Sequence, residues 1–354
     1  MKQFETQRLI LRPWQLEDLE DFNHYCQDPE VGPNAGWKPH ESLEESRAIL
    51  EDWLRPDQED ELWCIEEKES GKAVGSVGLH GEDRRPGVPG CKMVGYVLAH
   101  PCWGKGYMTE AVAPVIDYAF REEKLRLLTV NHFSFNQRSR RVIEKSGFRY
   151  EGTLRQGAVL YDGRVVDLCC YSMTAGDYHL LRARKQGLAL ALPEELPPEA
   201  VMAYQDEWDG ETMVSGFCAA RGKKSYEQWL GERVLWRRFP PRKDFVSGTT
   251  YFLIDREGCV AGSLDLRHEL NQHLLDFGGH IGYGIRPSCR GRGYAPMMLA
   301  LGLEKAKALG IGRALVTCND DNLPSAGTIE ACGGVLENTV LEEGKPLRRY
   351  WIDL

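Results

Sequence analysis

Two short glycine-rich segments of this sequence have the composition of a phosphate-binding turn. The first is Trp103-Gly-Lys-Gly-Tyr-Met-Thr, and the second is Arg290-Gly-Arg-Gly-Tyr-Ala-Pro. In such a turn, glycine lets a ligand approach the backbone, and the N–H groups that open the following helix attract an anion. The spacing is neither that of the G-x-G-x-x-G dinucleotide fingerprint nor that of the lysine-bearing P-loop. We expect both segments to bind a diphosphate.

The two segments are part of a longer internal repeat. Residues that return 187 positions later are Gly75, Ser76, Leu79, Gly95 and Tyr96, as Gly262, Ser263, Leu266, Gly282 and Tyr283. Further along, the offset is 186, and Asn136, Ser139, Glu144 and Gly147 return as Asn322, Ser325, Glu330 and Gly333. A solenoid would need a period of about 20 to 50 residues. We therefore predict two homologous domains in tandem, at residues 1–178 and 187–354.

Composition and charge argue against several classes of protein. Of the 354 residues, 42% are hydrophobic, which is enough for two ordinary cores. A net charge of −9 without a block of lysine and arginine argues against nucleic-acid binding through phosphate neutralisation. The start has no apolar signal-peptide core, and no run of about 18 apolar residues occurs, so we expect a cytoplasmic protein with no membrane partner. Eleven cysteines without a Cys-x-x-Cys pair predict neither a metal site nor a disulfide framework.

Hydrophobic periodicity predicts the elements that position the glycine segments. In the first domain we expect strands at 8–12, 62–66, 73–79, 92–99, 127–131 and 165–173. Helices are expected after 13–18, at 41–54, after the glycine segment and at 139–145. In the second we expect strands at 188–192, 250–254, 260–267, 280–285, 314–318 and 349–353, and a long helix at 296–309. The order is strand, two helices, three strands, helix, strand, helix and two strands. A helical linker at 175–187 would join the domains.

With these elements around them, the glycine segments resemble the pyrophosphate motif of the GNAT superfamily, the acetyl-CoA-dependent N-acetyltransferases. That motif reads Gln/Arg-x-x-Gly-x-Gly/Ala, and Arg290, Gly293 and Ala295 match it. In the first domain only Gly106 matches strictly. Trp103 stands where the motif has a polar residue, and Met108 stands where it has a small one. The Trp-Gly-x-Gly-Tyr form resembles the motif of the Rim-type branch. Members of that branch acetylate ribosomal-protein N-termini, and some relatives act on small molecules. The second domain resembles acetyltransferases without an assigned substrate.

The resemblance implies an α/β (α+β) fold in each domain: a mixed, mostly antiparallel, splayed sheet flanked by helices. The pantetheine arm of acetyl-CoA would lie where the fourth and fifth strands part. The residues implied to bind it in the first domain are Val97, Leu98, Ala99, Trp103, Gly104, Lys105, Gly106, Tyr107, Met108, Thr109 and Asn136. In the second domain they are Gly284, Ile285, Arg286, Arg290, Gly291, Arg292, Gly293, Tyr294, Ala295 and Asn322.

The resemblance also implies direct attack of an amine on the thioester, with a proton donor for the leaving thiolate. Many members of the superfamily place a tyrosine seven residues after the motif asparagine, but Ile143 and Ile329 occupy those positions here. Ser139 and Ser325 are therefore the candidate donors. Serine three residues after asparagine is also a helix-start pattern, so the two serines could instead belong to caps, and the asparagines could simply begin their helices.

No general base can be assigned from the sequence alone. In the second domain His280 opens the expected fourth strand, with Tyr283, His268 and Glu269 as rivals. In the first domain Glu82 and Asp83 precede the equivalent strand, and a water relay remains open in both. Candidate acceptor-binding residues lie between the first two strands of each domain: Trp37, Glu41, Glu44 and Glu45, and Trp208, Asp209, Glu211, Trp229 and Trp236. The same residues would also suit an amphipathic helix with a solvated face.

The sequence favours an enzyme that transfers acetyl from acetyl-CoA to a primary amine, on a small molecule or a protein N-terminus. The alternative is an acyl-CoA-binding or interaction protein in which one or both domains have lost turnover. The domains could also pack as a pseudo-dimer that completes a neighbour's acceptor pocket. The sequence leaves open the acceptor, the activity of each domain and the oligomeric state.

Overall fold

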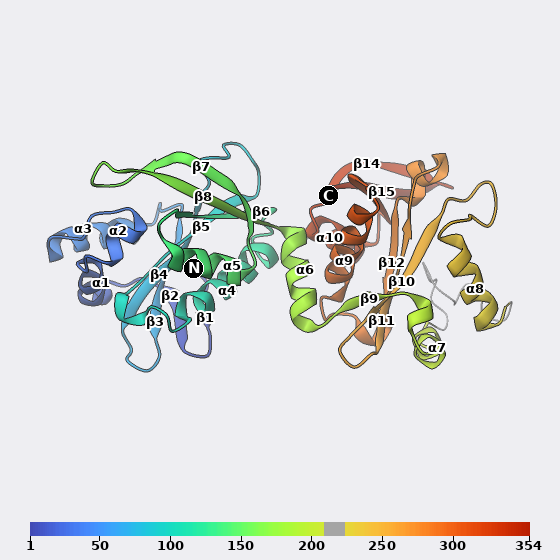
Figure 1. Ribbon diagram of the computed structural model, residues 1–354, viewed down its shortest axis with the longest axis horizontal. Coiled ribbons are helices and arrows are strands. Elements are labelled where there is room, and N and C mark those ends of the chain that lie inside the picture. The colour runs from blue at the N-terminus through green and yellow to red at the C-terminus, as the bar shows by residue number, and fades with distance from the viewer. Residues whose placement is uncertain (209–223) are drawn as a thin grey trace. The chain divides into compact units, whose positions relative to one another are not determined.

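The computed structural model describes residues 1–208 and 224–354, which form two compact units, Met1–Thr174 and Ala175–Leu354. Each unit contains one β-sheet with helices on both faces (Figure 1). Helix α6 (Ala175–Gln186) occupies the expected junction and packs against α9 of the second unit. The expected α/β fold with two mixed, mostly antiparallel sheets is confirmed.

The sheet of the first unit has the strand order β1-β2-β3-β4-β5-β6-β8-β7. Its strands are β1 (Phe4–Glu5), β2 (Leu9–Pro13), β3 (Glu61–Glu67), β4 (Ala73–Gly81), β5 (Cys91–Leu98), β6 (Leu127–Phe133), β7 (Arg149–Val159) and β8 (Val165–Thr174). Its helices are α1 (Leu19–Cys26), α2 (Val31–Ala35), α3 (Leu43–Trp53), α4 (Tyr107–Arg121) and α5 (Gln137–Ser146). Neighbouring strands are antiparallel except for β5 and β6.

The second unit repeats this topology in the order β9-β10-β11-β12-β13-β15-β14. Its strands are β9 (Ala189–Ala191), β10 (Gly248–Ile254), β11 (Val260–Arg267), β12 (Ile281–Ile285), β13 (Arg313–Asn319), β14 (Val335–Glu342) and β15 (Lys345–Asp353). Besides α6, its described helices are α7 (Pro198–Asp206), α8 (Tyr226–Trp236), α9 (Tyr294–Ala308) and α10 (Leu323–Ala331). Here β12 and β13 form the parallel pair.

Both parallel pairs part soon after they begin. Strand β5 pairs with β6 only from Cys91 to Met93, and β12 pairs with β13 only at Ile281. Beyond these residues the strands diverge, so the end of β5 and the end of β12 each border a gap in their own sheet. The family resemblance implied this splay, and it opens directly before the glycine segment of each unit.

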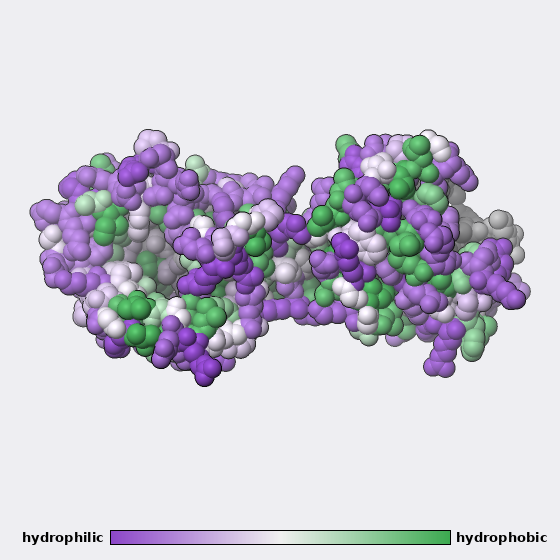
Figure 2. All heavy atoms as spheres, turned by 90° about the horizontal axis from the view of Figure 1, so that it is seen from above, coloured by the Kyte–Doolittle hydropathy of each residue, from purple (hydrophilic) through white to green (hydrophobic). Residues whose placement is uncertain are grey.

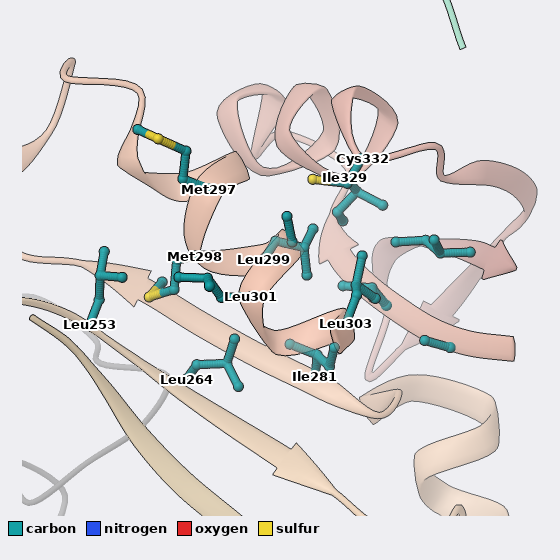
Figure 3. Close-up of a cluster of buried hydrophobic side chains, with 14 of the residues drawn as sticks. Leu253, Leu264, Ile281, Met297, Met298, Leu299, Leu301, Leu303, Ile329 and Cys332 are labelled. Atoms are coloured by element: carbon teal, nitrogen blue, oxygen red, sulfur yellow. The ribbon is translucent and has the colours of Figure 1, made fainter. Parts of the chain in front are cut away.

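The cores lie between the sheets and their helices. Helix α4 buries one face, formed by Ala111, Val112, Val115, Ile116, Ala119 and Phe120 among others, as its periodicity predicted. Helix α9 is buried almost all round, and Figure 3 shows Met298, Leu299 and Leu303 among the buried side chains around it. Gly302 lets the Leu264 side chain approach, because a Cβ there would lie 2.5 Å from a Leu264 methyl carbon.

The visible surface of each unit is mainly hydrophilic, with hydrophobic residues in separate small groups (Figure 2). In the part of the chain that the structure describes, no helix combines the length and apolar character needed to cross a membrane.

Candidate active site

The two glycine segments have the same backbone conformation. Gly104 and Gly106 have φ values of 76° and 82°, and Gly291 and Gly293 have φ values of 76° and 74°. Side chains other than glycine rarely adopt this left-handed region. Gly106 and Gly293 directly precede α4 and α9, and neither helix has a side-chain cap. The first N–H groups of both helices are therefore available to an anion.

A basic side chain lies beside each turn. In the first unit Arg8 donates to the carbonyl oxygen of Lys105 at 3.0 Å, and its Nε bonds Glu110 at 2.8 Å. In the second unit the guanidinium of Arg182 lies 3.9 Å from the place where a Cβ on Gly293 would be. At the first turn the charge of Arg8 is paired with Glu110, whereas at the second turn the guanidinium of Arg182 adds positive charge to the helix dipole.

The structure explains why Trp103 stands where the motif has a polar residue. The indole N–H of Trp103 donates to the carbonyl oxygen of Leu98, at the end of β5, over 2.7 Å. In the second unit Nε of Arg290 donates to the carbonyl oxygen of Ile285, at the end of β12, over 3.2 Å. Tryptophan and arginine therefore make the same contact, which ties each glycine turn to the strand before it.

A cavity of about 460 Å³, here called the loop cavity, runs from the first glycine turn into the gap between β5 and β6. Of the predicted residues, those that line it are Val97, Leu98, Trp103, Gly104, Gly106, Tyr107, Met108, Thr109, Asn136 and Ser139. Arg138, Arg141 and Lys145 contribute cationic side chains from α5. Ala99 instead donates its N–H to Val74, and the carbonyl of Lys105 accepts from Arg8.

An asparagine, a serine and a tyrosine form the same cluster in both units. The side-chain oxygen of Asn136 accepts the N–H of Ser139 at 3.0 Å and caps α5. The hydroxyl of Ser139 lies 2.9 Å from that of Tyr96 on β5. In the second unit Asn322 caps α10 through the N–H of Ser325 at 3.1 Å, and Ser325 lies 3.1 Å from the hydroxyl of Tyr283. The asparagines are thus caps, and each serine pairs with a tyrosine.

Tyr96 is a site residue that the sequence reasoning missed. Burial raises the pKa of the Tyr96 and Tyr283 hydroxyls, so both stay protonated at neutral pH. Such a group can donate a hydrogen bond to negative charge but cannot serve as a base. The signal was present in the sequence, because Gly95-Tyr96 and Gly282-Tyr283 are one of the repeated blocks.

His280 is held by the backbone of β13. The backbone N–H of His280 donates to the carbonyl oxygen of Leu315 at 2.7 Å, and the ring Nδ1 of His280 accepts the backbone N–H of Leu315 at 2.9 Å. Burial lowers the pKa of His280, which keeps the imidazole neutral. These contacts hold the start of β12 against β13. Its rival His268 contacts the hydroxyl of Thr249 at 2.8 Å.

In the second unit an aromatic side chain covers the end of β12. A Cβ on Gly284 would lie 3.1 Å from the indole of Trp208, which is buried. The Arg290 guanidinium lies over the same indole, 5.4 Å from its ring. The guanidinium of Arg286 is paired with Glu207, to which its Nε donates at 2.6 Å. Gly291 and Arg292 lie in the turn, and Tyr294 and Ala295 begin α9.

The candidate acceptor residues are spread over several surroundings. Glu41 forms an exposed pair with Lys38, and Glu45 accepts the N–H of Glu41. Trp229 is buried, and Arg233 lies over Trp236 at 4.4 Å. Asp209 and Glu211 lie outside the described residues. Within the described ranges, no group of three or more His, Cys, Asp and Glu side chains could hold a metal ion.

Comparison with known proteins identifies the family of both units. The model of the acetyltransferase (GNAT) domain matches residues 8–149 and again 197–335. The uncharacterized N-acetyltransferase p20 of Bacillus licheniformis is 28% identical over 183 residues, which cover 50% of this chain and 99% of that protein. The Bacillus subtilis protein YdaF, named provisionally as a ribosomal N-acetyltransferase, is 35% identical over 127 residues, which cover 35% of this chain and 66% of YdaF.

Among solved structures, the ribosomal-protein-S5-alanine acetyltransferase of Vibrio fischeri is 23% identical, with a TM-score of 0.42. The match covers 49% of this chain and 98% of that one. The double match of the family model confirms the tandem arrangement predicted from the internal repeat.

Proposed function

The chain belongs to the acetyltransferase (GNAT) family, and we propose that it transfers the acetyl group of acetyl-CoA to a primary amine, with the loop cavity of the first unit as the donor site. The observation that carries the proposal is this cavity, because it joins an uncapped helix start to a partly buried pair of hydroxyls. A diphosphate and a thioester need those two features at opposite ends of one site.

The two ends of the cavity favour one orientation of acetyl-CoA. The pyrophosphate lies over the turn from Gly104 to Thr109, where helix N–H groups point outward and Arg138, Arg141 and Lys145 add positive charge nearby. The pantetheine arm runs along the end of β5, which stays paired with β4 but has no partner on the β6 side beyond Met93. Its amides then bond the backbone of Val97 as an added strand would. This orientation brings the thioester to Tyr96 and Ser139.

The chemistry needs no covalent enzyme intermediate. The neutral amine attacks the carbonyl carbon, a C–N bond forms, and the C–S bond breaks. The ammonium form of the acceptor loses two protons in all; one ends on the thiolate of CoA and the other goes to solvent. Tyr96 donates a hydrogen bond to the leaving sulfur, since its raised pKa opposes full proton transfer to a thiolate whose conjugate acid has a pKa of about 8.5.

Calorimetric titration of the intact protein with acetyl-CoA tests the donor site. Aspartate tolerates left-handed φ, so Gly106→Asp keeps the turn but places a negative charge against the diphosphate. We expect affinity at the first site to fall about 100-fold. Gly163→Asp is the matched control, because Gly163 has a φ of 83° and open space around it in another turn. Equal affinities in both variants would refute the donor site.

The second unit supports a different candidate function: acyl-CoA binding without turnover. It keeps the glycine turn and the Tyr283–Ser325 pair, but Trp208 covers Gly284 on the strand that would border the arm. Thiol release from acetyl-CoA in the presence of amines separates the two roles. Activity abolished by Gly106→Asp and unaffected by Gly293→Asp would assign turnover to the first unit alone.

A further inference from the structure

A second cavity lies in the first unit, on the far side of the β5–β6 gap from α5. Its volume is about 390 Å³, and it is formed by the segment after β4 and by strands β6, β7 and β8. Val130 and Asn131 of β6 line both this cavity and the loop cavity. The two cavities therefore border the same part of β6, where it parts from β5.

Charged groups of the second cavity gather where the strands part. Thr129, the last β6 residue paired with β5, donates its hydroxyl to the Glu82 carboxylate. Met93 is its partner on β5, and the Met93 sulfur lies 3.9 Å from Nη1 of Arg84 and 3.2 Å from Nδ2 of Asn131. Glu82 and Arg84 thus stand beside the one point at which the gap opens.

The Arg84 guanidinium is available to a ligand, because it is not hydrogen-bonded to Glu82. The Glu82 side chain is only 4% exposed, and one of its oxygens accepts the N–H of Arg84 at 3.0 Å. The guanidinium of Arg84, however, is 3.8 Å from the Glu82 carboxylate, too far for a hydrogen bond, and it is 42% exposed. Arg85 and Glu151, across the cavity, bond each other. The Arg84 guanidinium thus makes no hydrogen bond to Glu82, whereas Arg85 is hydrogen-bonded to Glu151.

We infer that the second cavity binds the acceptor of the first unit, and that this acceptor is a small molecule whose primary amine lies close to an anionic group; the inference rests on the proposed function. The ammonium group replaces Arg84 as the partner of Glu82, and the anionic group takes the open donors of Arg84. Glu82 accepts one proton from the ammonium nitrogen, whose lone pair then attacks the thioester across the gap. A polyamine would instead bring further positive charge against Arg84 and Arg85.

Matched substrate pairs test the anionic requirement. The assay measures thiol release by the full chain carrying Gly293→Asp, which silences the second glycine turn. One pair is β-alanine and its amide; the other is phosphoethanolamine and ethanolamine. We expect at least a 10-fold higher kcat/KM for the anionic member of one pair, and the pair that shows it distinguishes a carboxylate from a phosphate. Equal or better use of both neutral members overturns the inference.

Variants of the cavity give a second readout. Arg84→Gln should reduce the preference about 10-fold, mainly through KM, whereas Arg121→Gln on the exposed end of α4 should leave it unchanged. Glu82→Gln should lower kcat, because it removes the group that accepts the ammonium proton. A preference that survives Arg84→Gln overturns the inference.

Calorimetry with acetyl-CoA separates the two possible failures. If none of the four amines is acetylated while acetyl-CoA still binds, the acceptor assignment falls and the donor site stands. If acetyl-CoA does not bind, both fall.

Discussion

The two units agree in their glycine turns and Asn–Ser–Tyr clusters and differ in the side chains beside them. The Asn–Ser–Tyr clusters match within 0.2 Å, as in the tyrosine–serine distances of 2.9 and 3.1 Å, and the glycine turns share their φ values. By contrast, Val97 and Gly284 occupy equal places, each opposite a serine of the preceding strand, yet only Gly284 lies under an indole. The duplicated chain has thus kept the glycine turn and the Asn–Ser–Tyr cluster, whereas the cationic residues Arg138, Arg141 and Lys145 are replaced in the second unit by Pro324, Gly327 and Ala331.

The long helices show how context changes a repeated element. Helix α4 is amphipathic, while α9 has buried residues at nearly every position from Met297 to Leu303. The reason is α6, which packs on the outer side of α9 and shares its core through Leu180 and Ala183. A helix that is covered on both sides gains from apolar residues all round. The composition of α9 therefore reflects α6 rather than a different function.

The largest difference between the two units is expected when their tyrosines are replaced. Tyr96→Phe removes the donor to the leaving sulfur and should lower kcat about 100-fold, as the loss of one preorganised donor does elsewhere. Tyr283→Phe should have no effect on turnover if the second unit only binds. Steady-state thiol release measures both variants, and acetyl-CoA affinity serves as the control. A larger loss in Tyr283→Phe would reverse the roles of the units.

A smaller effect is expected where Trp208 meets Gly284. Gly284→Val gives the second unit the residue of the first and should cost about 1 to 3 kcal/mol of stability, because its Cβ crowds the indole. Combined with Trp208→Ala, the same change should cost less, which a double-mutant cycle in urea measures as a coupling energy. Additive effects would show that the indole does not occupy the space above Gly284 in solution.

The smallest effect expected is at His280, where the first unit has Met93. Burial lowers the pKa of His280, so the unfolded chain binds its proton first as the pH falls below about 6.5. Stability from this group is therefore full above that pH and is lost as the pH drops toward the folded value. His280→Asn keeps an acceptor for the Leu315 N–H but cannot titrate. In this variant, urea unfolding should show that the second unit loses less free energy of unfolding between pH 7 and pH 5.5 than it does in the original protein. An unchanged dependence on pH would contradict this prediction.

Much of the donor side could be read from the sequence, because it depends on local geometry. The glycine positions follow from left-handed φ values, and the roles of Asn136 and Asn322 follow from their spacing to the serines. The motif departure at Trp103 could not be interpreted in this way. Its indole replaces an arginine only because both reach the same carbonyl on the preceding strand, a contact that no local pattern encodes.

The sequence by itself determined the tandem repeat, the order of elements and the glycine turns, since each depends on residues close together in the chain or on an offset that can be counted. It offered the helix caps only as one of two interpretations. Tertiary structure alone decided the pairing of Tyr96 with Ser139, 43 residues away, the approach of Glu82 to Thr129 and the cover of Gly284 by Trp208. These contacts depend on where two parallel strands stop pairing. That point is set by packing across the whole sheet, which hydrophobic periodicity does not specify.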